Sequence, residues 1–362
     1  MLKIKETENV FVTEIKKAKA QGKSIYILGA ALGAKRIAYG LKFKGLDFDA
    51  FVVDKEYYTP NMKYLDKDVL CLYDLDANES VFIRSIANYP RLNEIKNRMQ
   101  MIDEDVLSLS MVASDPLDLK YIQTNFNQFN NFYNSLEDDE SKAVMEAYLN
   151  QKITGRFSEM SKVWRKVQYF DGDFYDLSKV NCIVDCGAYI GDSFLSFCDE
   201  YEKQSGMAFK GTGFLFDPDE NNQILIKKNC SGCKAEVIGI KAGVLDKKGK
   251  MAFQSDDNYG NAGKISDIGD IEIDVETIDE IVMDRTVDFI KMDIEGVELR
   301  ALRGGETTIK KNHPILAICA YHKREDILEL SDYIRSLYKG YKFYLRAYGG
   351  PYSIELVLYA VV

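Results

Sequence analysis

Residues 183–193 read IVDCGAYIGDS, and residues 289–296 read FIKMDIEG. Each stretch begins with the apolar residues of a buried strand and ends in a polar turn that contains glycine. In open α/β sheets such turns lie at the carboxyl edge, where ligands bind. The first stretch brings an acid, two glycines and a hydroxyl to that edge, and the second brings two carboxylates. Together they predict a site for a small nucleoside-containing cofactor, next to a reaction that needs negative charge or a base.

Strands and helices alternate from residue 180 to the end, which predicts a doubly wound α/β sheet. The expected strands are 183–185, 212–217, 235–240, 251–254 as a short edge strand, 271–275, 289–293, 315–320, 342–346 and 355–362, with helices at 192–204, from 219, up to 311 and at 324–337. The last two strands are too close in sequence for a helical crossover, so they must form an antiparallel hairpin. A parallel sheet closed by one antiparallel C-terminal strand is the architecture of class I methyltransferases.

The N-terminal region predicts a smaller Rossmann-like α/β domain. Residues 23–54 read as a βαβ unit, in which Asp54 closes the second strand about 25 residues after Gly29, the spacing of a dinucleotide fold. However, Ala31 and Ala34 stand where that fold has its second and third glycines, and the methyl group of Ala31 would crowd a pyrophosphate. Two interpretations stay open, nucleotide binding and a module for docking or oligomerisation. A polar helix is expected from about residue 92.

The chain of 362 residues exceeds what one hydrophobic core normally serves. We expect the Rossmann-like domain at 1–114, a helical connector at 115–169 and the methyltransferase-like domain at 170–362. The aromatic residues Tyr169 and Phe170 at this last boundary would either cover the cofactor pocket or pack against the first helix.

The net charge of −10 argues against nucleic acid or an anionic membrane as the main partner. No stretch reaches the roughly 18 apolar residues of a membrane span, and the first 21 residues hold no apolar run of signal-peptide length. Seven cysteines, an odd number on a long chain, are typical of a reducing compartment. These features predict a cytoplasmic protein with a small-molecule partner. The pair in CSGC, residues 230–233, reads as a plain turn because no further ligands complete a zinc site.

The second half of the chain resembles the FkbM-type methyltransferases, over about residues 169–362. The resemblance is carried by residues 184–193, by FDPD at 216–219, by IKMDIEGVE at 290–298 and by LRGG at 302–305. It implies S-adenosyl-L-methionine as the cofactor and a hydroxyl as the methyl acceptor, in a carbohydrate or glycan precursor. The family often has glutamate where Asp217 stands and another near Cys319 or Ala320, where this chain has only His322 as a polar group.

The turns described above suit the parts of that cofactor. Asp185 can bind its ammonium, Gly187 lets the backbone approach closely, and Asp217 can accept both ribose hydroxyls. The remaining predicted cofactor-binding residues are Ala188, the helix start Gly191, Asp192 and Ser193, and the strand-end residues Lys241 and Ala242. Asp219 is expected to cap the following helix.

Methyl transfer to an alcohol needs a group that takes the acceptor's proton. The predicted catalytic residues are His322, Asp293 and Glu295. The two carboxylates could also bind a divalent metal, but without an obvious third ligand we expect no metal. Lys291 is expected to be their structural partner, and Glu298 to favour the helix dipole.

Two other functions stay open on the sequence alone, an NAD(P)-dependent oxidoreductase built on the first domain and a non-catalytic ligand-binding or partner module. The absence of a Tyr-x-x-x-Lys pair near a second site counts against the first, and the four acids Asp185, Asp217, Asp293 and Glu295 count against the second. Acceptor specificity is expected from loops such as 255–270. Self-association as a homo-oligomer through the N-terminal domain is a hypothesis.

Overall fold

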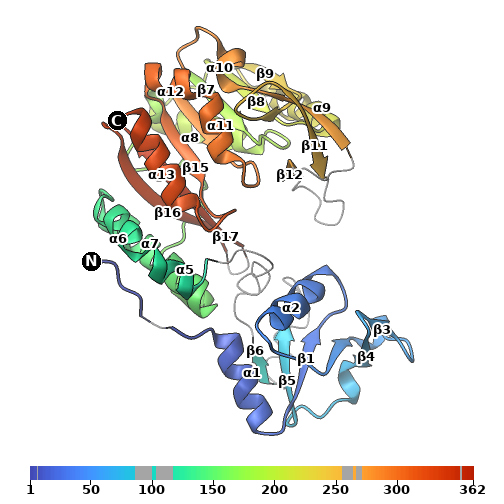
Figure 1. Cartoon of the computed structure of the whole chain (residues 1–362). Helices are drawn as coiled ribbons and strands as arrows, with labels where there is room; N and C mark the ends of the chain where they lie inside the picture. Colours follow the sequence, from blue (N-terminus) through green and yellow to red (C-terminus); the bar gives the residue numbers. More distant parts are fainter. Residues whose placement is uncertain (6, 86–99, 103–116, 255–263, 266–270, 351–352) are drawn as a thin grey trace.

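The computed structural model describes residues 1–5, 7–85, 100–102, 117–254, 264–265, 271–350 and 353–362. The predicted polar helix from about residue 92 and nearly all of the predicted specificity loop 255–270 lie outside these residues. The described strands form sheets of six, four and seven strands. The six-stranded sheet is N-terminal and the seven-stranded sheet is C-terminal, with helices around both (Figure 1). The predicted α/β fold class is confirmed.

The N-terminal sheet has the strand order β3-β4-β2-β1-β5-β6. Its strands are β1 (Ser24–Leu28), β2 (Ala50–Val53), β3 (Lys63–Tyr64), β4 (Lys67–Cys71), β5 (Ser80–Arg84) and β6 (Gln100–Ile102), all parallel except β3. Helix α1 (Val10–Ala20) precedes β1, and α2 (Leu32–Phe43) connects β1 to β2. Numbered in chain order, the five parallel strands lie in the order 3-2-1-4-5, which a dinucleotide-binding fold uses for five of its six strands.

The turn after β1 has its glycines at positions 29 and 33, which differs from the glycine pattern of such folds. Gly29 has a φ of +112°, which glycine adopts at little cost. A Cβ on Gly33 would lie 2.2 Å from the backbone oxygen of Ser85, so this glycine allows α2 to pack closely on the strand end. Gly33 thus does the packing work that the sequence pattern assigned to position 34. Ala31, the N-cap of α2, is exposed.

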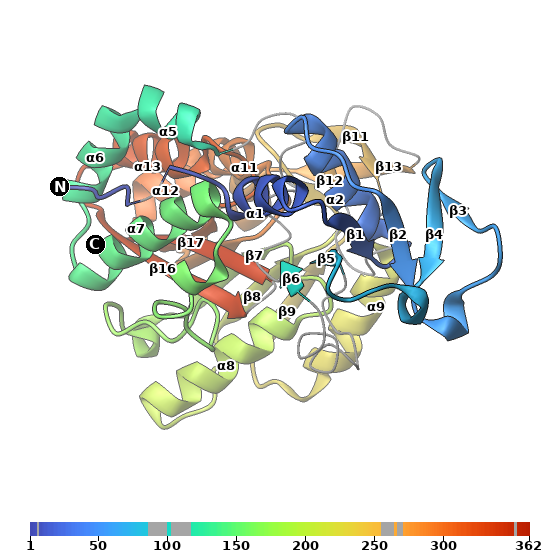
Figure 2. The ribbon, with the colours of Figure 1, turned by 90° about the horizontal axis from the view of Figure 1, so that it is seen from below.

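The helices α5 (Leu119–Thr124), α6 (Phe126–Asn134) and α7 (Asp139–Thr154) lie beside the seven-stranded sheet (Figures 1 and 2). Residues of α6 and α7 share one hydrophobic cluster with that sheet. The buried guanidinium of Arg346, on the sheet, pairs with Asp138 at 2.7 Å, and Ser141 Oγ accepts from the backbone N–H of Leu345. The first residues of the chain also lie here, since Asn150 on α7 accepts from the N–H of Lys5 and donates to Lys3 O.

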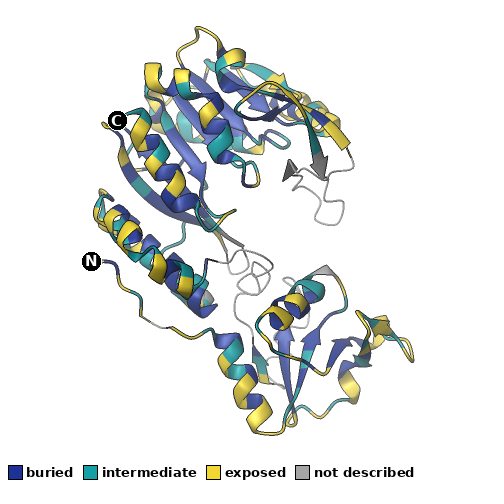
Figure 3. Cartoon of the chain, in the orientation of Figure 1, coloured by how far each residue is buried: buried dark blue, intermediate teal, exposed yellow. Residues whose placement is uncertain are grey.

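The seven-stranded sheet has the order β16-β17-β15-β14-β7-β8-β9. Its strands are β7 (Cys182–Cys186), β8 (Thr212–Phe216), β9 (Glu236–Ile240), β14 (Phe289–Met292), β15 (Ile315–Cys319), β16 (Lys342–Gly350) and β17 (Ser353–Val361). The helices are α8 (Asp192–Ser205), α9 (Glu220–Asn229), α10 (Ile278–Val282), α11 (Glu298–Gly304), α12 (Glu306–Asn312) and α13 (Asp326–Leu337). The inner strands β7, β8, β14 and β15 are buried on both faces, as expected for a parallel sheet between helices, whereas the edge strand β9 is partly exposed (Figure 3).

The hairpin of the last two strands is confirmed, and so is the antiparallel direction of the last one. Strand β17 does not close the sheet at its edge. It lies between β15 and β16, pairing with both. Every residue of β17 from Leu356 to Ala360 is fully buried, which explains why this strand is almost continuously apolar.

Two strands predicted for the main sheet belong to another sheet. The strand predicted at 251–254 is β11 (Gly249–Gln254), and it is an inner strand of the four-stranded sheet β10-β13-β11-β12. There it pairs antiparallel with β13 (Ile271–Glu276); the other members are β10 (Gly243–Val244) and β12 (Lys264–Ile265). In β13, buried Ile273 and Val275 alternate with exposed Glu272 and Asp274, a pattern of half-buried antiparallel strands.

The helix predicted to run to residue 311 is two helices, α11 and α12, which meet at Gly305. Gly304 explains the close packing there, because a Cβ on it would lie 2.0 Å from Leu245 O. The plain turn predicted at the CSGC pair is confirmed as a single 3₁₀ turn, Cys230–Gly232, and all seven cysteines are free thiols. None of the described helices has the length and apolar character to cross a membrane.

Candidate active site

Four strand ends meet at the carboxyl edge of the seven-stranded sheet, in the order β8, β7, β14, β15. The register pairs Cys186 with Phe216 on one side and with Met292 on the other. The residues that follow these strands are therefore neighbours. The turn at Gly187 lies between Asp217 and Asp293, and the two sequence stretches thus meet at one sheet edge, as predicted.

Gly187 is required by a close approach of two turns. Its φ is +82°, and a Cβ on it would lie 2.0 Å from the carbonyl oxygen of Asp293. The N–H groups of Gly187 and Ala188 donate to Phe216 O at 3.1 and 2.9 Å. Ala188 is fully buried, so it braces this turn, and Gly191, with φ +85°, starts α8.

Asp185 is buried in an ion pair within the sheet. It is 1% exposed, and its carboxylate lies 3.0 Å from the Nζ of Lys291. Ser193 Oγ donates to the other carboxylate oxygen, and Lys291 also donates to Gly187 O at 2.7 Å. Lys291 was expected to partner the acids of the 293–296 turn, but its ion pair is with Asp185. Asp185 and Ser193 therefore hold the turn in shape, while Asp192 at the helix start is exposed.

Asp217 follows β8 at the edge of the site and is 9% exposed. Its Oδ1 accepts from the N–H of Asp219 at 2.9 Å and from Asn222 at 3.1 Å. Burial raises the pKa of Asp217 to about 6. Asp219 caps α9 as predicted, accepting from the N–H groups of Asn221 and Asn222.

The end of β9 contributes less than expected. Lys241 is exposed and forms an ion pair with Glu220 on α9, and Ala242 is buried. The side-chain amide of Gln223 instead joins this strand end to β8, donating to Asp217 O at 2.8 Å and to Ile240 O at 3.0 Å. Gln223 was not predicted, because an amide on a polar helix carries no local signal.

Asp293 lies at the end of β14 among three side chains that reach it from other elements. Tyr169 donates to its Oδ2 at 2.9 Å, Tyr321 to its Oδ1 at 3.4 Å, and His322 Nε2 lies 3.4 Å from Oδ1. Burial raises the pKa of Asp293. The charges of Lys291 and His322 and the hydrogen bond from Tyr169 lower it by more than burial raises it, so the net shift is downward. Asp293 is thus an ionised carboxylate with a side chain about one quarter exposed.

The sequence left open whether Tyr169 and Phe170 cover the pocket or pack against the first helix, and the structure places them differently. It is 5% exposed, with its hydroxyl on Asp293 and 3.4 Å from Cys319 Sγ, whereas Phe170 packs against Phe197 and Phe289. One aromatic therefore reaches the acidic site and the other packs in the core.

His322 follows β15 and faces four carboxylates. Its Nε2 lies 3.7 Å from Glu295 Oε2 in addition to its contact with Asp293, and its Nδ1 lies 2.9 Å from Glu298 Oε1. Burial lowers the pKa of His322, but the hydrogen bond and charge of Glu298 and the charges of Asp293 and Glu295 raise it to about 9. At neutral pH this histidine is an imidazolium.

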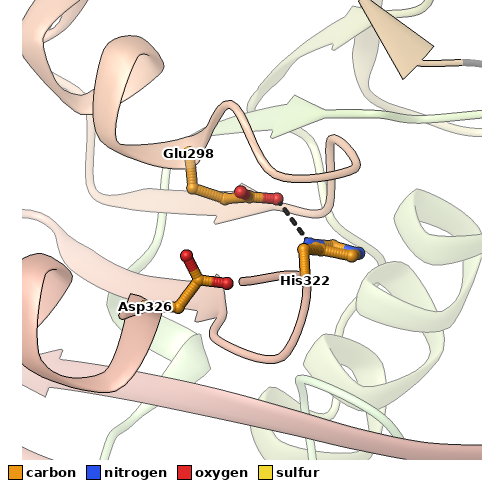
Figure 4. A group of neighbouring side chains, drawn as sticks. All are labelled: Glu298, His322 and Asp326. Atoms are coloured by element: carbon orange, nitrogen blue, oxygen red, sulfur yellow. Dashed lines mark ion pairs between the residues drawn. The ribbon is translucent and has the colours of Figure 1, made fainter. Parts of the chain in front are cut away.

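Glu298, His322 and Asp326 form a compact group (Figure 4). One donor atom from each lies within 4.8 Å of the others, while Asp293 and Glu295 belong to no such group among the described residues. Glu298 is 1% and Asp326 5% exposed. The imidazolium of His322 lies beside both of these carboxylates.

A cavity of about 560 Å³ lies elsewhere, between α1, α5 and the end of α7. None of the predicted site residues lines it. The acidic site at the sheet edge, with its burial and converging polar groups, remains the candidate active site.

Comparisons with known proteins found one matching family model and similar solved structures. Residues 185–343 match the model of the methyltransferase FkbM domain. The chain is similar to a crystal structure of Methyltransferase FkbM from Methylobacillus flagellatus, with 22% identity and a TM-score of 0.73 over 96% of this chain and 92% of that one. A SAM-dependent methyltransferase from Leishmania major is much more distant, with 11% identity and a TM-score of 0.26 over 52% of this chain and 66% of that one. No curated protein matches the sequence.

The neighbour from Methylobacillus flagellatus establishes the fold over nearly the whole chain. The family match covers all four strand ends of the site, from Asp185 through Asp217 and Asp293 to His322. The chain is therefore a methyltransferase whose residues 185–343 match the FkbM domain.

Proposed function

We propose that the protein transfers a methyl group from S-adenosyl-L-methionine to a hydroxyl of a small molecule, in a carbohydrate or glycan precursor. The observation that carries the proposal is the row of strand ends, where a glycine turn lies between a buried acid on one side and a cluster of acids and a histidine on the other. This separates a place for a cofactor from a place for proton transfer.

The residues present fit the cofactor. Gly187 and Gly191 leave the two ends of the turn without side chains, and the first N–H groups of α8 suit a carboxylate. Asp217 would accept hydrogen bonds from the ribose hydroxyls. Because its carboxylate is buried, these hydrogen bonds would stabilise its charged form. Because the charge of Asp185 is already paired with Lys291, Asp185 would contribute to ammonium binding only indirectly, by holding the turn in its shape.

The bound cofactor supplies a methyl group that is already activated by a positive sulfur. The chain's own residues then align the acceptor and take its proton. Asp293 is the group we assign to that role, because it is ionised and partly exposed, with Glu295 beside it. His322, protonated at neutral pH, holds Asp293 in place and stabilises its charge.

Assays of S-adenosylhomocysteine formation test the reaction. Purified protein is given S-adenosyl-L-methionine and a panel of free sugars, nucleotide sugars and simple phenols, with Asp293→Asn as the test variant and exposed Asp199→Asn on α8 as the matched control. Sugar-dependent turnover that Asp293→Asn lowers at least 100-fold, with Asp199→Asn unchanged, supports the proposal. Turnover on phenols alone would reject the carbohydrate acceptor, and full activity of Asp293→Asn would reject the assigned base.

A further inference from the structure

Glu298 has more contacts with the proposed site than a helix-dipole role requires. It is the first residue of α11, yet its carboxylate points back into the protein and is 1% exposed. Its Oε1 accepts from the N–H groups of Ile294 and Gly296 at 3.1 and 3.2 Å. These bonds hold the turn that carries Asp293 and Glu295, in which Glu295 has a φ of +57° and Gly296 of +95°.

The same oxygen contacts His322. Its distance to Nδ1 is 2.9 Å (Figure 4). Nε2, on the other side of the ring, lies 3.4 Å from Asp293 Oδ1 and 3.7 Å from Glu295 Oε2. A carboxylate on one ring nitrogen fixes the orientation of the imidazole and decides what the other nitrogen presents. Glu298 Oε2 is buried and has no hydrogen-bond partner among the described residues, so the contact with His322 brings a positively charged partner to this buried carboxylate.

We propose that Glu298 is a positioning residue of this active site: it orients His322 through Nδ1, so that Nε2–H meets Asp293, and fixes the turn that carries both candidate acids. One carboxylate thereby couples the ends of β14 and β15. The role deepens the proposed function, because it matters for turnover only if Asp293 receives the acceptor's proton.

The charged groups around His322 come from three elements. They are Asp293 and Glu295 in the turn after β14, Glu298 on α11, and Asp326 on α13, whose Oδ2 accepts from the N–H of Lys323 at 2.7 Å. Glu298 is the one in contact with Nδ1. Removing its charge alone should therefore make His322 easier to deprotonate while the other three carboxylates still favour the proton.

The chain contains only two histidines, so the state of His322 can be measured directly. His313 has a φ of +47° and ends α12, a position that asparagine also tolerates. In a His313→Asn background, nuclear magnetic resonance of histidine-labelled protein reports His322 alone. We expect its titration midpoint near pH 9, and in Glu298→Gln at least one unit lower, with kcat reduced about 10- to 100-fold.

Glu306→Gln is the matched control. Glu306 is also the first residue of a seven-residue helix, α12, but its carboxylate contacts Lys310 and Tyr333. It should change neither the midpoint nor kcat. An unchanged midpoint in Glu298→Gln, or a stability loss equal in the two variants with kcat intact, would overturn the proposal.

A divalent ion found at one equivalent per chain by elemental analysis would also overturn it, because the ion would then supply the charge. The titration does not depend on the reaction. If the midpoint moves but no methyl transfer is found, the positioning role stands and the proposed function fails.

Discussion

The surroundings of Asp217 disfavour its charged form, whereas the surroundings of His322 favour its charged form. Asp217 is buried and forms no ion pair with the described residues, so its ionised form is disfavoured. The side chain of His322 is only 8% exposed, but the carboxylates around it favour its charged form. The carboxylate of Asp217 can therefore accept further hydrogen bonds from a ligand. The charge of His322 is already balanced by its carboxylate neighbours. This difference supports a ligand-binding role for Asp217 and a positioning role for His322.

The burial of Asp217 makes a prediction about stability. Because the pKa of Asp217 is raised from 3.8 to about 6, its ionisation costs the folded state free energy above pH 6 and nothing below about pH 4. Asp217→Asn should therefore raise the free energy of unfolding of the ligand-free protein by up to about 3 kcal/mol at pH 7.5. Urea unfolding at pH 7.5 and pH 4 measures this. A variant less stable than the parent at pH 7.5 would contradict the raised pKa.

The protonation of His322 makes a prediction about turnover. Since the imidazolium supports Asp293, kcat should fall as pH rises through about 9, where His322 loses its proton. His322→Gln should lower kcat about 10-fold or more at pH 7.5 and remove this high-pH limb. The pH profiles of parent and variant check both points. A parent rate that rises through pH 9 would instead make neutral His322 the base.

At the scale of elements, the site depends on turns that bring strand ends into contact. Gly187 and Gly206 both have positive φ, of +82° and +72°, but only Gly187 has a neighbour where a Cβ would be. Gly206→Ala, which ends α8 in open space, should cost about 1 kcal/mol for the left-handed backbone alone. Gly187→Ala should cost roughly 2 kcal/mol more and weaken cofactor binding, because the Asp293 turn must move. Equal losses in chemical denaturation would show that this contact does not matter.

The sequence predicted most of the elements of the C-terminal sheet, because apolar strands and acid-glycine turns are local signals. The acids Asp217 and Asp293 were found in this way. Tyr169 reaches the site from a distant segment, and the contact between Glu298 and His322 joins residues 24 positions apart, so no local pattern indicates them. Gln223 lies only six residues after Asp217, but an amide on a polar helix carries no signal of its contacts. Strands β11 and β13 were misplaced because a strand's pattern reveals its buried faces but not the sheet that it joins.

At the scale of the whole molecule, the helices α5 to α7 and the methyltransferase sheet are held together by one hydrophobic cluster. The N-terminal sheet has separate clusters of its own. We therefore expect that residues 119–154 stabilise the catalytic region, and that the N-terminal domain contributes less to it.

Truncation tests this expectation. A fragment of residues 117–362 should fold and unfold cooperatively, with reduced stability because Leu2 and the bonds to Asn130 and Asn150 are lost. A fragment of residues 170–362 should be insoluble or molten, because it leaves buried Arg346 without Asp138. Circular dichroism and thermal unfolding compare the two. A stable 170–362 fragment would contradict the shared core.

Isothermal titration with S-adenosylhomocysteine measures whether the turns after β7 and β8 bind S-adenosyl-L-methionine. We expect one site of micromolar affinity, weakened about 10- to 100-fold by Asp217→Ala and unchanged by Asp199→Asn. Absence of binding, or equal affinity in Asp217→Ala, would contradict this expectation.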